Sequence, residues 1–597
     1  MRWTYLNPDP AAVQRLAQEA ALPPLLARLL ILRGITGVSQ ADAFLSPSLE
    51  QLHSPYLMLG MREAIERISA AIARHELTLI YGDYDVDGTT AVVILKTAIE
   101  LCGGTADFHV PHRIKEGYGI KDDVIERAAA AGVKLVISVD TGIRAFQAAE
   151  TAQRVGVDLI VTDHHLPEAS HGVPNALAVL NPNQQGCHYP CKALCGAGVA
   201  FKIAQALFAR FKDSADQAKL IPSFLKMVAM ATIADAVPLI DENRAIARLG
   251  LEGLRKPVNG GLKALMEVSG LAGLGRALSA SDVGFRLGPR INAAGRMDVA
   301  RDVIELFTCK DLQRCREIAQ KLDQLNAERQ NEEARIVAEI ESQLAADPDL
   351  KERFCMVFDG EGWHRGVVGI VASRVVEKTG RPALVIAVEG EEAHGSGRSI
   401  SALHLLDALE CCHELFTRFG GHSHAVGFAL PSAQVSELKY RLNQFAQSRL
   451  KLEDLEPELS IDAELPLSEV TPGLMQTLAR MEPFGQGNPE PVFSAGSVNL
   501  LLPPRIIKDK HIKLRVNQKR DGLKQSFNYE AVGWRMAERL GEANLQAGDR
   551  LDLAFKVAMN FHPDFGGLEL MLEDFRKSAA IAVYSERSPV YIPLDGK

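Results

Sequence analysis

The chain has 597 residues, 47% of them hydrophobic, and a formal net charge of −9 at pH 7. Its mean hydropathy of −0.01 is ordinary for a globular protein, and no stretch approaches the roughly 20 apolar residues of a membrane span. The acidic total excludes a generally basic nucleic-acid coat but not local basic patches, because phosphate binding depends on local charge. The N-terminal sequence MRWTYLNPDPAAVQRL lacks the apolar core of a signal peptide, so we expect a cytoplasmic location.

Nine cysteines are few for this length and suit a reducing compartment without disulfides. Cys187, Cys191 and Cys195 lie close together in GCHYPCKALCGAG, with His188 beside the first. A structural zinc site usually needs two ligand pairs, and no second pair follows this segment. We therefore expect buried cysteines in a loop that leads into a helix.

The first part of the chain predicts helices followed by a parallel β-sheet. Residues 1–45 have a helical pattern. Four apolar runs then alternate with helical stretches: LTLIY (77–81), VKLVISV (133–139), VDLIVT (157–162) and ALAVL (176–180). Such alternation is typical of βαβ units, which place helices on both faces of a parallel sheet.

The second part predicts a connector, a smaller α/β domain and a β module. Residues 310–345 contain neither Gly nor Pro and are densely charged, which predicts one long exposed helix between domains. The α/β pattern resumes with FCMVF (354–358) and ALVIAV (383–388), and the short β runs beyond about residue 456 favour an OB-like barrel. The expected α/β multidomain chain divides into 1–45, 46–305, 306–352, 353–455, 456–576 and a tail, 577–597.

Three carboxylates lie within five residues in LIYGDYDVDGTTAVVIL (79–95), between two apolar runs. Repulsion among Asp83, Asp85 and Asp87 raises their pKa values unless a cation neutralises them. The string D-x-D-x-D-G also begins an EF-hand loop, which needs a glutamate at its twelfth position. That position is Ile94, so an EF-hand is excluded and the acids need partners elsewhere in the chain.

Further candidate ligands follow two other strands of the predicted sheet. Asp140 comes directly after the second apolar run, and Asp163, His164 and His165 come directly after the third. Because ligands bind outside the carboxyl ends of parallel strands, we expect these groups to meet at one sheet edge. Asp235 lies in the apolar segment MATIADAVPLI, where an unpaired carboxylate is costly. Each acid alone could cap a helix or form a turn, but their coincidence predicts a metal centre.

The predicted ligand set also favours particular metals. Carboxylate oxygens with one imidazole suit Mn²⁺ or Mg²⁺ better than a thiolate-rich zinc site. The aspartates supply enough negative charge for two ions, with one acid bridging them. Two ions roughly 3.5–4 Å apart can activate a water and stabilise the leaving oxygen of a phosphoryl displacement. We therefore expect hydrolysis of a phosphodiester or a phosphoanhydride.

The string Asp163-His164-His165 together with the upstream DYDVDG resembles the DHH phosphoesterase superfamily. Four later motifs resemble its bacterial single-strand-specific 5′→3′ exonucleases in order and spacing: LGPRINAAGRM (287–297), GSGRSI (395–400), FGGHSHAVGF (419–428) and MEPFGQGNPEPVF (481–493). This resemblance covers nearly the whole chain. It implies a DHH catalytic domain, a long connecting helix, a DHH-associated domain and a C-terminal OB-fold, which together hydrolyse single-stranded DNA to mononucleotides in DNA repair and recombination.

The family pattern implies metal-ligand roles for five residues: Asp85, Asp87, Asp140, His164 and Asp235. Asp140 would bridge two ions, and His165 would contact the scissile phosphate or the metal shell. Asp83 and Asp163 would orient the ligands and fix the imidazole tautomers. Many DHH phosphatases carry a metal-binding histidine four residues before the acid that corresponds to Asp85, whereas this chain has Tyr81 there. The first metal site is therefore expected to have one protein ligand fewer.

The same resemblance implies contacts to DNA phosphates. The candidates are Arg113 in VPHRIKEGYG, Arg290 and Arg296 in GPRINAAGR, Ser396, Gly397 and Arg398 in GSGRSI, and His422 in FGGHSHAVGF. A hydroxyl, a backbone amide and a guanidinium together suit a phosphate terminus, although an arginine near a glycine is ordinarily a surface residue. A pocket for the 5′-terminal phosphate would explain the direction of hydrolysis.

The β module contains a basic stretch. RIIKDKHIKLRVNQKRDGLK (505–524) has eight Lys or Arg against two Asp, and Phe527, Tyr529 and Trp534 follow it. Cations and rings on a small barrel suit single-stranded nucleic acid, with phosphates on the cations and bases on the rings. A basic hairpin with core aromatics is the alternative.

Two other functions stay open at this point. One is a DHH phosphodiesterase that acts on short oligonucleotides or cyclic dinucleotides, and the other is an inactive DNA-binding scaffold. The long connector and the extra barrel oppose the first, and the full set of acids and histidines opposes the second. As partners, the resemblance implies a single-stranded DNA-binding protein and a RecQ-type helicase, and we expect the chain to be a monomer.

Overall fold

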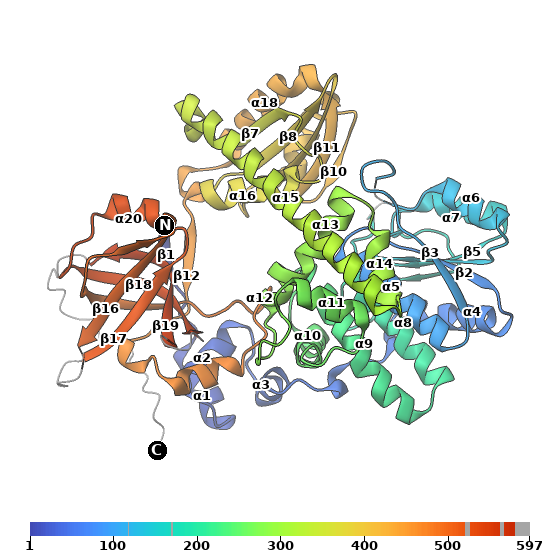
Figure 1. Cartoon of the computed structure of the whole chain (residues 1–597), viewed down its shortest axis with the longest axis horizontal. Coiled ribbons are helices and arrows are strands. Elements are labelled where there is room, and N and C mark those ends of the chain that lie inside the picture. The colour runs from blue at the N-terminus through green and yellow to red at the C-terminus, as the bar shows by residue number, and fades with distance from the viewer. Residues whose placement is uncertain (118, 169–170, 520–525, 561–565, 579–597) are drawn as a thin grey trace. The chain divides into compact units, whose positions relative to one another are not determined.

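The computed structural model describes residues 1–117, 119–168, 171–519, 526–560 and 566–578. The chain, drawn in Figure 1, divides into two compact units. The larger unit contains Leu52–Val237 and Ala245–Pro457, and the smaller unit contains Met1–Gln51, Pro238–Arg244 and the chain from Glu458 onward. Within the described residues, no helix combines the length and the apolar character needed to cross a membrane.

The first sheet of the larger unit has five parallel strands in the order β3-β2-β4-β5-β6. They are β2 (Leu77–Tyr81), β3 (Thr105–His109), β4 (Leu135–Val139), β5 (Asp158–Thr162) and β6 (Ala178–Leu180). Four of these strands coincide with the apolar runs, so the predicted parallel sheet is confirmed. The sequence does not predict β3, because this edge strand, TADFH, is partly polar and largely unburied.

Helices cover both faces of this sheet. Successive strand residues point to opposite faces, so each face contributes to its own hydrophobic core. Ile80 and Ile137 face one core, whereas Leu79 and Val136 face another. The helices of this region are α4 (Met61–Ala73), α5 (Val86–Leu101), α6 (Asp122–Ala130), α7 (Phe146–Val155), α8 (Gly196–Phe211), α9 (Ser214–Ala234), α10 (Asp241–Gly253), α11 (Gly260–Val268), α12 (Ala280–Asp282), α13 (Gly288–Met297) and α14 (Arg301–Thr308).

One long helix, α15 (Leu312–Ala346), connects the first sheet's domain to a second domain. Its first half buries Cys315 and Leu322 in the core of the first domain. Its second half buries Ile336 and Ile340 in a core of the second domain. The predicted connecting helix is therefore confirmed. Its expected exposure is wrong for the buried side of the helix, because a helix that contacts two cores needs an apolar face.

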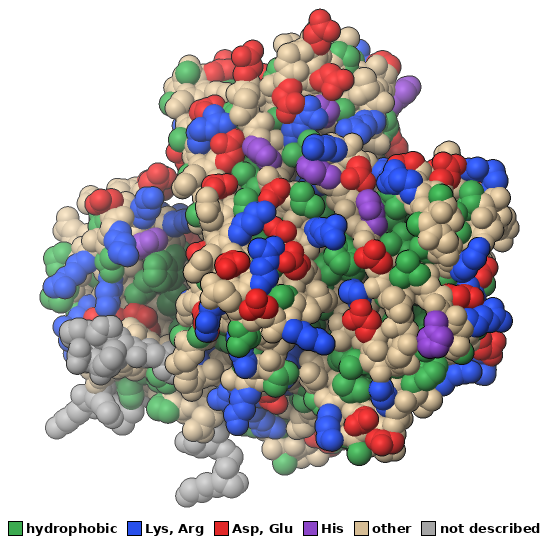
Figure 2. Space-filling view, turned by 45° about the vertical axis from the view of Figure 1, so that its right-hand side comes forward, with side chains coloured by type: hydrophobic (Ala, Val, Ile, Leu, Met, Phe, Trp, Pro, Cys, Tyr) green, Lys and Arg blue, Asp and Glu red, His purple; other side chains and the backbone are tan. Residues whose placement is uncertain are grey.

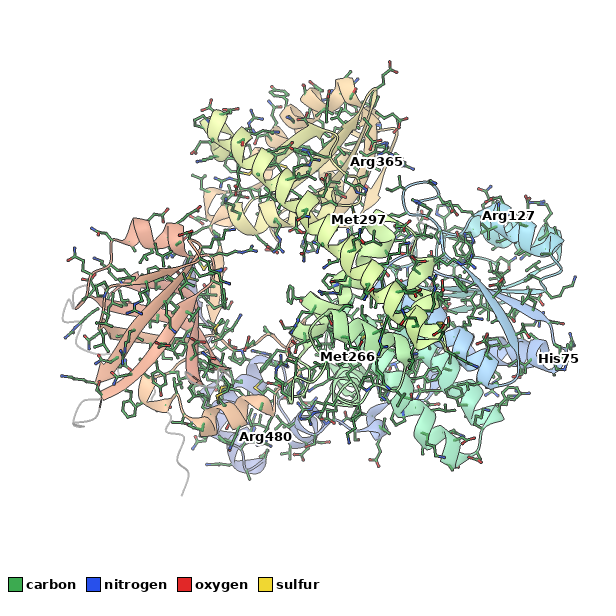
Figure 3. The ribbon with its side chains drawn as sticks, in the orientation of Figure 1. His75, Arg127, Met266, Met297, Arg365 and Arg480 are labelled. Atoms are coloured by element: carbon green, nitrogen blue, oxygen red, sulfur yellow. The ribbon has the colours of Figure 1, made fainter. Side chains whose placement is uncertain are left out.

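The second domain of the larger unit is a smaller α/β domain, as predicted. Its sheet has the order β10-β11-β9-β8-β7, with β7 and β8 parallel and the other pairs antiparallel. Met297, at the end of α13 and labelled in Figure 3, packs against one of its cores. The elements are β7 (Met356–Glu361), α16 (Val368–Thr379), β8 (Ala383–Glu389), β9 (Glu392–Arg398), α17 (Leu405–Glu410), β10 (Arg418–Gly421), β11 (Ala425–Pro431) and α18 (Val435–Arg449).

The smaller unit contains a closed five-stranded barrel. The strands pair in the order β14-β18-β19-β17-β16, and β16 pairs back with β14. This closure is that of an OB-fold, so the predicted C-terminal barrel is confirmed. The elements are β13 (Ala463–Glu464), α19 (Pro472–Ala479), β14 (Phe493–Leu500), β15 (Arg505–Ile507), β16 (His511–Lys519), β17 (Ser526–Gly533), α20 (Ala537–Ala543), β18 (Arg550–Asn560) and β19 (Gly567–Lys577). Of the expected tail, 579–597 lie outside the described residues.

The N-terminal residues belong to the same unit as the barrel. Helices α1 (Pro10–Glu19), α2 (Pro24–Leu32) and α3 (Val38–Leu45) share one hydrophobic core with it, and β1 (Arg2–Tyr5) pairs in parallel with β12 (Glu458–Ile461). The buried Arg244 donates hydrogen bonds to the main-chain carbonyls of Phe44 and Met481. The sequence predicts the N-terminal helices but not this pairing, because contacts between the two ends of a chain leave no local pattern.

Candidate metal centre

The three acids of DYDVDG lie in the turn between β2 and α5, which we call the acid loop (residues 83–87). Asp85 is the N-cap of α5, and its Oδ1 accepts a hydrogen bond from the amide of Gly88 at 3.0 Å. Gly88 must lack a side chain, because a Cβ there would lie 2.7 Å from the backbone nitrogen of Asp83. The turn therefore gathers carboxylates at a helix N-terminus, where the helix dipole favours negative charge.

Asp140 follows β4 in a left-handed backbone conformation with φ of +59°. It is buried, and Gly196 at the start of α8 packs against it so closely that a Cβ on that glycine would lie 2.5 Å from the Cβ of Asp140. A strained backbone that the surrounding structure enforces is typical of functional sites.

The start of α8 also positions Asp87. The two carboxylate oxygens of Asp87 accept hydrogen bonds from the amides of Gly196 at 2.6 Å and Ala197 at 2.8 Å. Two amide donors fix the plane of this carboxylate, which leaves its remaining lone pairs for a cation.

Asp163 holds the histidine pair in place. Its Oδ1 accepts from the amide of His164 at 2.8 Å and lies 2.7 Å from Nδ1 of His165, and its Oδ2 accepts from the amide of Ile143 at 2.9 Å. Burial alone would raise the pKa of Asp163, but its hydrogen bond with His165 lowers this pKa below its usual value. Burial alone would lower the pKa of His165, but the same hydrogen bond raises it to about 9. Asp163 therefore has the contacts expected of an orienting group.

The expected ligands converge. The potential ligand atoms lie within 4.8 Å of one another in three overlapping groups of described residues: Asp83, Asp85 and Asp140; Asp140, His164 and His165; and Asp87, His164 and Asp235. Nε2 of His164 lies 3.2 Å from Oδ1 of Asp140, 3.7 Å from Oδ2 of Asp87 and 3.8 Å from Oδ2 of Asp235. We call these seven residues the metal centre. Asp140 and His164 each belong to two groups. Of these two, only the Asp140 carboxylate has two oxygens that two adjacent cations could share.

The electrostatics of the metal centre fit divalent cations. Burial, together with neighbouring carboxylates, raises the pKa of Asp83 and of Asp235 to about 8 and also raises the pKa values of Asp85 and Asp140. Among the described residues, Oδ1 of Asp83 and Oδ1 of Asp140 have no hydrogen-bond donor although both are buried. Buried carboxylate oxygens that lack donors are the ligands that Mn²⁺ and Mg²⁺ prefer.

Tyr81 does not take the place of the missing histidine ligand. Its hydroxyl donates to the main-chain carbonyl of Gly119 at 3.0 Å, and burial raises its pKa. A neutral phenol in this bond contributes nothing to a cation, so the first ligand group depends on carboxylates.

Figure 2 shows Lys and Arg side chains interspersed with Asp and Glu on the face that it draws, so candidate phosphate contacts have to be sought in local groups. Arg113, Arg296 and Arg398 form one. Burial and the charges of Arg113 and Arg398 lower the pKa of Arg296 to about 10, and burial and Arg113 lower the pKa of Arg398. A bound anion would stabilise the charged forms of Arg296 and Arg398.

The N-terminus of α16 completes this group. Ser396 Oγ and Arg398 Nη2 lie 3.3 Å and 3.4 Å from the point where a Cβ on Gly369 would be, in the first turn of α16. Hydroxyl, guanidinium and helix N-terminus together suit a terminal phosphate. We call Arg113, Arg296, Ser396 and Arg398 the phosphate site.

The structure places the other candidates differently. Nε of Arg290 donates to Oδ1 of Asp323 on α15 at 2.8 Å, so this guanidinium holds two helices together. Gly397 faces the domain core, where a Cβ would lie 2.8 Å from Leu405 and from Val426. His422 follows β10 in the second domain, and burial, together with the charges of His424 and Arg398, lowers its pKa.

Two supporting residues of the metal centre were not candidates in the sequence. Oδ1 of Asn292 accepts from the amide of Val86 at 3.1 Å, and a Cβ on Gly295 would lie 2.3 Å from the carbonyl oxygen of Tyr84. The motif GPRINAAGRM therefore holds the acid loop from α13. Asn292 and Gly295 both lie within this motif, so the motif is the sequence signal for the support.

The cysteine prediction is confirmed. Cys187, Cys191 and Cys195 are buried and form no disulfide among the described residues, and they contribute to the main core of the first domain. None of them belongs to a potential metal-binding group of the described residues.

The barrel presents part of the predicted nucleic-acid surface. Trp534 is 58% exposed and packs edge-on against His511, so its ring is accessible for stacking. Phe527 and Tyr529 instead pack against the barrel core, as in the alternative interpretation. Within the basic stretch, 520–525 lie outside the described residues.

The architecture and the site define the class of protein. The DHH family N-terminal domain model matches residues 78–232, and the DHHA1 domain model matches residues 352–448. The chain is therefore a DHH-type α/β protein whose acids and histidines meet at the carboxyl edge of a parallel sheet.

Further similarity specifies the family. The RecJ OB domain model matches residues 461–574. The chain is 35% identical to the single-stranded-DNA-specific exonuclease RecJ of Dickeya dadantii, over 96% of this chain and 98% of that protein, and 35% identical to that of Bacillus subtilis, over 96% and 70%. The crystal structure of RecJ in complex with Mn²⁺ from Thermus thermophilus matches with a TM-score of 0.80 at 28% identity, covering 97% of this chain and 80% of that one. The chain belongs to the RecJ family, which confirms the resemblance seen in its motifs.

Proposed function

We propose that the protein is a metal-dependent 5′→3′ exonuclease that hydrolyses single-stranded DNA to mononucleotides. The observation that carries this proposal is the convergence of Asp83, Asp85, Asp87, Asp140, His164, His165 and Asp235 at one sheet edge. The similar RecJ proteins of Bacillus subtilis and Dickeya dadantii are named single-stranded-DNA-specific exonucleases, and the similar RecJ structures from Thermus thermophilus contain Mn²⁺ or Mg²⁺.

The residues of the metal centre have distinct proposed roles. Asp85, Asp87, Asp140, His164 and Asp235 would hold two divalent ions, and Asp140 would be the ligand that the ions share. A pair of Mn²⁺ or Mg²⁺ ions supplies Lewis acidity for a water and for the phosphoryl oxygens. The hydrogen bond with Asp163 raises the pKa of His165 and favours its protonated form, so His165 is suited to contact the scissile phosphate. No side-chain nucleophile is needed.

The phosphate site supplies the proposed direction. A 5′-terminal phosphate held by Arg113, Ser396 and Arg398 places the first phosphodiester of the strand at the metal centre. Arg296 extends the cationic surface and also donates to the carbonyl of Gly366 at 3.1 Å, which joins the two domains of the larger unit. These contacts recognise phosphate, so base identity should matter little.

The barrel and the cellular context complete the proposal. Trp534 and the cations of β16 bind the single strand by stacking and charge. The protein acts as a cytoplasmic monomer in DNA repair and recombination, together with a single-stranded DNA-binding protein and a RecQ-type helicase.

Labelled substrates test this function directly. A long 5′-labelled single strand, the same strand in a duplex, and a dinucleotide are each incubated with the protein, with and without Mn²⁺. We expect rapid release of labelled mononucleotide from the single strand in the presence of Mn²⁺. Equal release from the duplex would remove the proposed strand specificity, and a clear preference for the dinucleotide would favour an oligonucleotide phosphodiesterase.

A further inference from the structure

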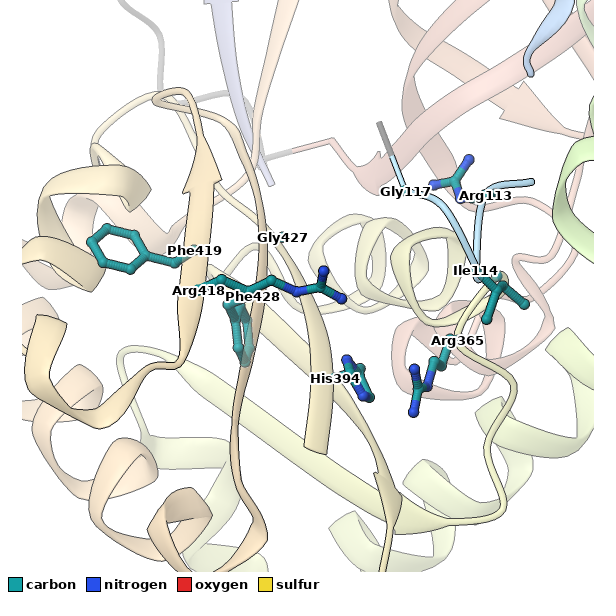
Figure 4. Close-up of a pocket in the computed structure, with 10 residues that line it drawn as sticks. Arg113, Ile114, Gly117, Arg365, His394, Arg418, Phe419, Gly427 and Phe428 are labelled. Atoms are coloured by element: carbon teal, nitrogen blue, oxygen red, sulfur yellow. The ribbon is translucent and has the colours of Figure 1, made fainter. Parts of the chain in front are cut away.

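A second cationic cavity lies beside the phosphate site, within the larger unit. Its volume is about 310 Å³, and its lining includes Arg113, Arg365, His394 and Arg418. Figure 4 shows the side chains of Arg365, His394 and Arg418 pointing into the same space. These three residues have no role in the metal centre or the phosphate site. We call this cavity the Arg418 pocket.

The Arg418 pocket lies on the sheet face that also carries part of the phosphate site. Ser396 on β9 pairs with Gly427 on β11, and Arg418 on β10 pairs with Ala429 on β11. Because side chains alternate across a strand, His394, Ser396 and Arg418 share one face. A Cβ on Gly427 would have no atom within 4 Å, so the backbone at Gly427 borders open space within the pocket.

The charges of this pocket are not balanced. Arg365 pairs with Glu389, with Nε and Oε1 2.6 Å apart, and burial lowers the pKa of His394. Within the described part of the chain, no acid forms an ion pair with Arg418 or Arg113. Two guanidinium groups without carboxylate partners match the charge of a phosphate monoester, roughly −1.5 to −2 at neutral pH.

The remaining lining and the size indicate what the phosphate is attached to. Ile114 is 40% exposed and lies across the cavity from Arg418 in Figure 4. Apolar surface beside cations suits a nucleoside with its phosphate. The volume lies at the lower end of the ~300–1,000 Å³ range of small-molecule sites, enough for one nucleotide.

We propose that the Arg418 pocket binds the mononucleotide product, a nucleoside 5′-monophosphate, after hydrolysis. This inference rests on the proposed function, which generates that product at the metal centre. Arg113 belongs both to the phosphate site and to the Arg418 pocket, so the product phosphate moves from one guanidinium surface to the next. Product can then occupy this pocket while the next 5′ end occupies the metal centre, and the inhibition that it causes is noncompetitive with DNA.

Equilibrium dialysis tests the binding. The Mn²⁺-loaded full chain is dialysed against labelled deoxyadenosine 5′-monophosphate, and we expect two bound molecules per chain in the wild type. Arg418→Ala and Gly427→Val should each reduce this to one bound nucleotide per chain. The valine side chain would occupy part of the pocket without backbone strain, because φ at Gly427 is not positive. The control Arg449→Ala, which removes an exposed arginine on α18, should keep two. One molecule in the wild type, or two in both pocket variants, would overturn the inference.

Two competitors define the ligand. Unphosphorylated deoxyadenosine should displace no nucleotide from the pocket, and inorganic phosphate should displace it only at concentrations at least about tenfold higher. Displacement by inorganic phosphate at equal concentration would contradict the nucleoside part of the proposal.

Inhibition kinetics provide an independent measurement. Added deoxyadenosine 5′-monophosphate should inhibit wild-type hydrolysis with a noncompetitive component that both pocket variants lose, while their initial kcat and KM stay within about twofold. Purely competitive inhibition in the wild type would contradict product binding in the Arg418 pocket.

If the protein hydrolyses no DNA, the proposed function fails, and dialysis still measures nucleotide binding in the pocket. If hydrolysis is intact and dialysis finds one nucleotide, only the pocket inference fails.

Discussion

The metal centre and the phosphate site carry opposite charge and are assembled in different ways. All metal-centre residues come from one domain, at the carboxyl edge of the first sheet or at the end of α9 beside it. The three arginines of the phosphate site come from two domains: Arg113 follows β3, Arg296 lies on α13, and Arg398 ends β9 of the second sheet. The metal centre therefore depends on one domain, whereas the proposed end selection depends on how α13 and α15 hold two domains together. Mutations should separate the two.

Asp140→Asn should have the largest effect, a fall in kcat of about 1,000-fold or more, because the shared ligand loses its charge. Asparagine tolerates the left-handed backbone of this position, so the fold should be kept. Binding of a 5′-phosphorylated single strand, measured by fluorescence anisotropy in Mn²⁺, should stay within about threefold. A variant that binds DNA poorly but hydrolyses each bound strand at the normal rate would contradict the shared-ligand role.

Arg398→Ala should have the next largest effect, on end selection. Loss of a charge-assisted hydrogen bond to phosphate should reduce the preference for 5′-phosphate over 5′-hydroxyl ends by about 10- to 100-fold. The measurement is the ratio of kcat/KM for the two ends of one oligonucleotide. Arg290→Ala is the control, because Arg290 pairs with Asp323, and it should leave this ratio unchanged. Equal ratios for wild type and Arg398→Ala would exclude the phosphate site as the source of direction.

The same comparison shows what the sequence could predict. Acids and histidines at three strand ends could be placed together because parallel strands deliver their carboxyl ends to one edge. The phosphate site could be inferred only from motif resemblance, and the structure engages Arg290 elsewhere because Asp323 lies on a helix distant in sequence. The support from Asn292 cannot be predicted from the sequence, because a neutral side chain that accepts one hydrogen bond from a backbone amide leaves no recognisable sequence pattern.

The stability of the metal-free protein should fall as pH rises. Asp83 and Asp235 have folded-state pKa values of about 8, well above the ~3.9 of an unfolded chain. The unfolded state therefore releases their protons first, and the free energy of unfolding decreases between about pH 4 and pH 8. His165, with a pKa of about 9, adds stability that is full below about pH 6.5 and is lost through pH 9.

A divalent ion should cancel the carboxylate part of this penalty. The rise in Tm on adding Mn²⁺ to chelator-treated protein should be larger at pH 8 than at pH 5.5, by several degrees in differential scanning fluorimetry. Asp140→Asn should flatten this dependence. The same rise in Tm at both pH values would mean that the carboxylates are already ionised in the metal-free fold.

Asn292→Ala should have the smallest effect and tests whether α13 positions the acid loop. The variant leaves the amide of Val86 without its acceptor, which should lower the free energy of unfolding by about 1–3 kcal/mol and weaken Mn²⁺ binding about tenfold. At saturating Mn²⁺, kcat should stay within about twofold of the wild type. The control is Asn259→Ala, which removes the N-cap bond to the amide of Leu262 at a comparable cost in stability. If both variants shift the Mn²⁺ midpoint equally, the change follows global stability, and α13 has no specific role in holding the ligands.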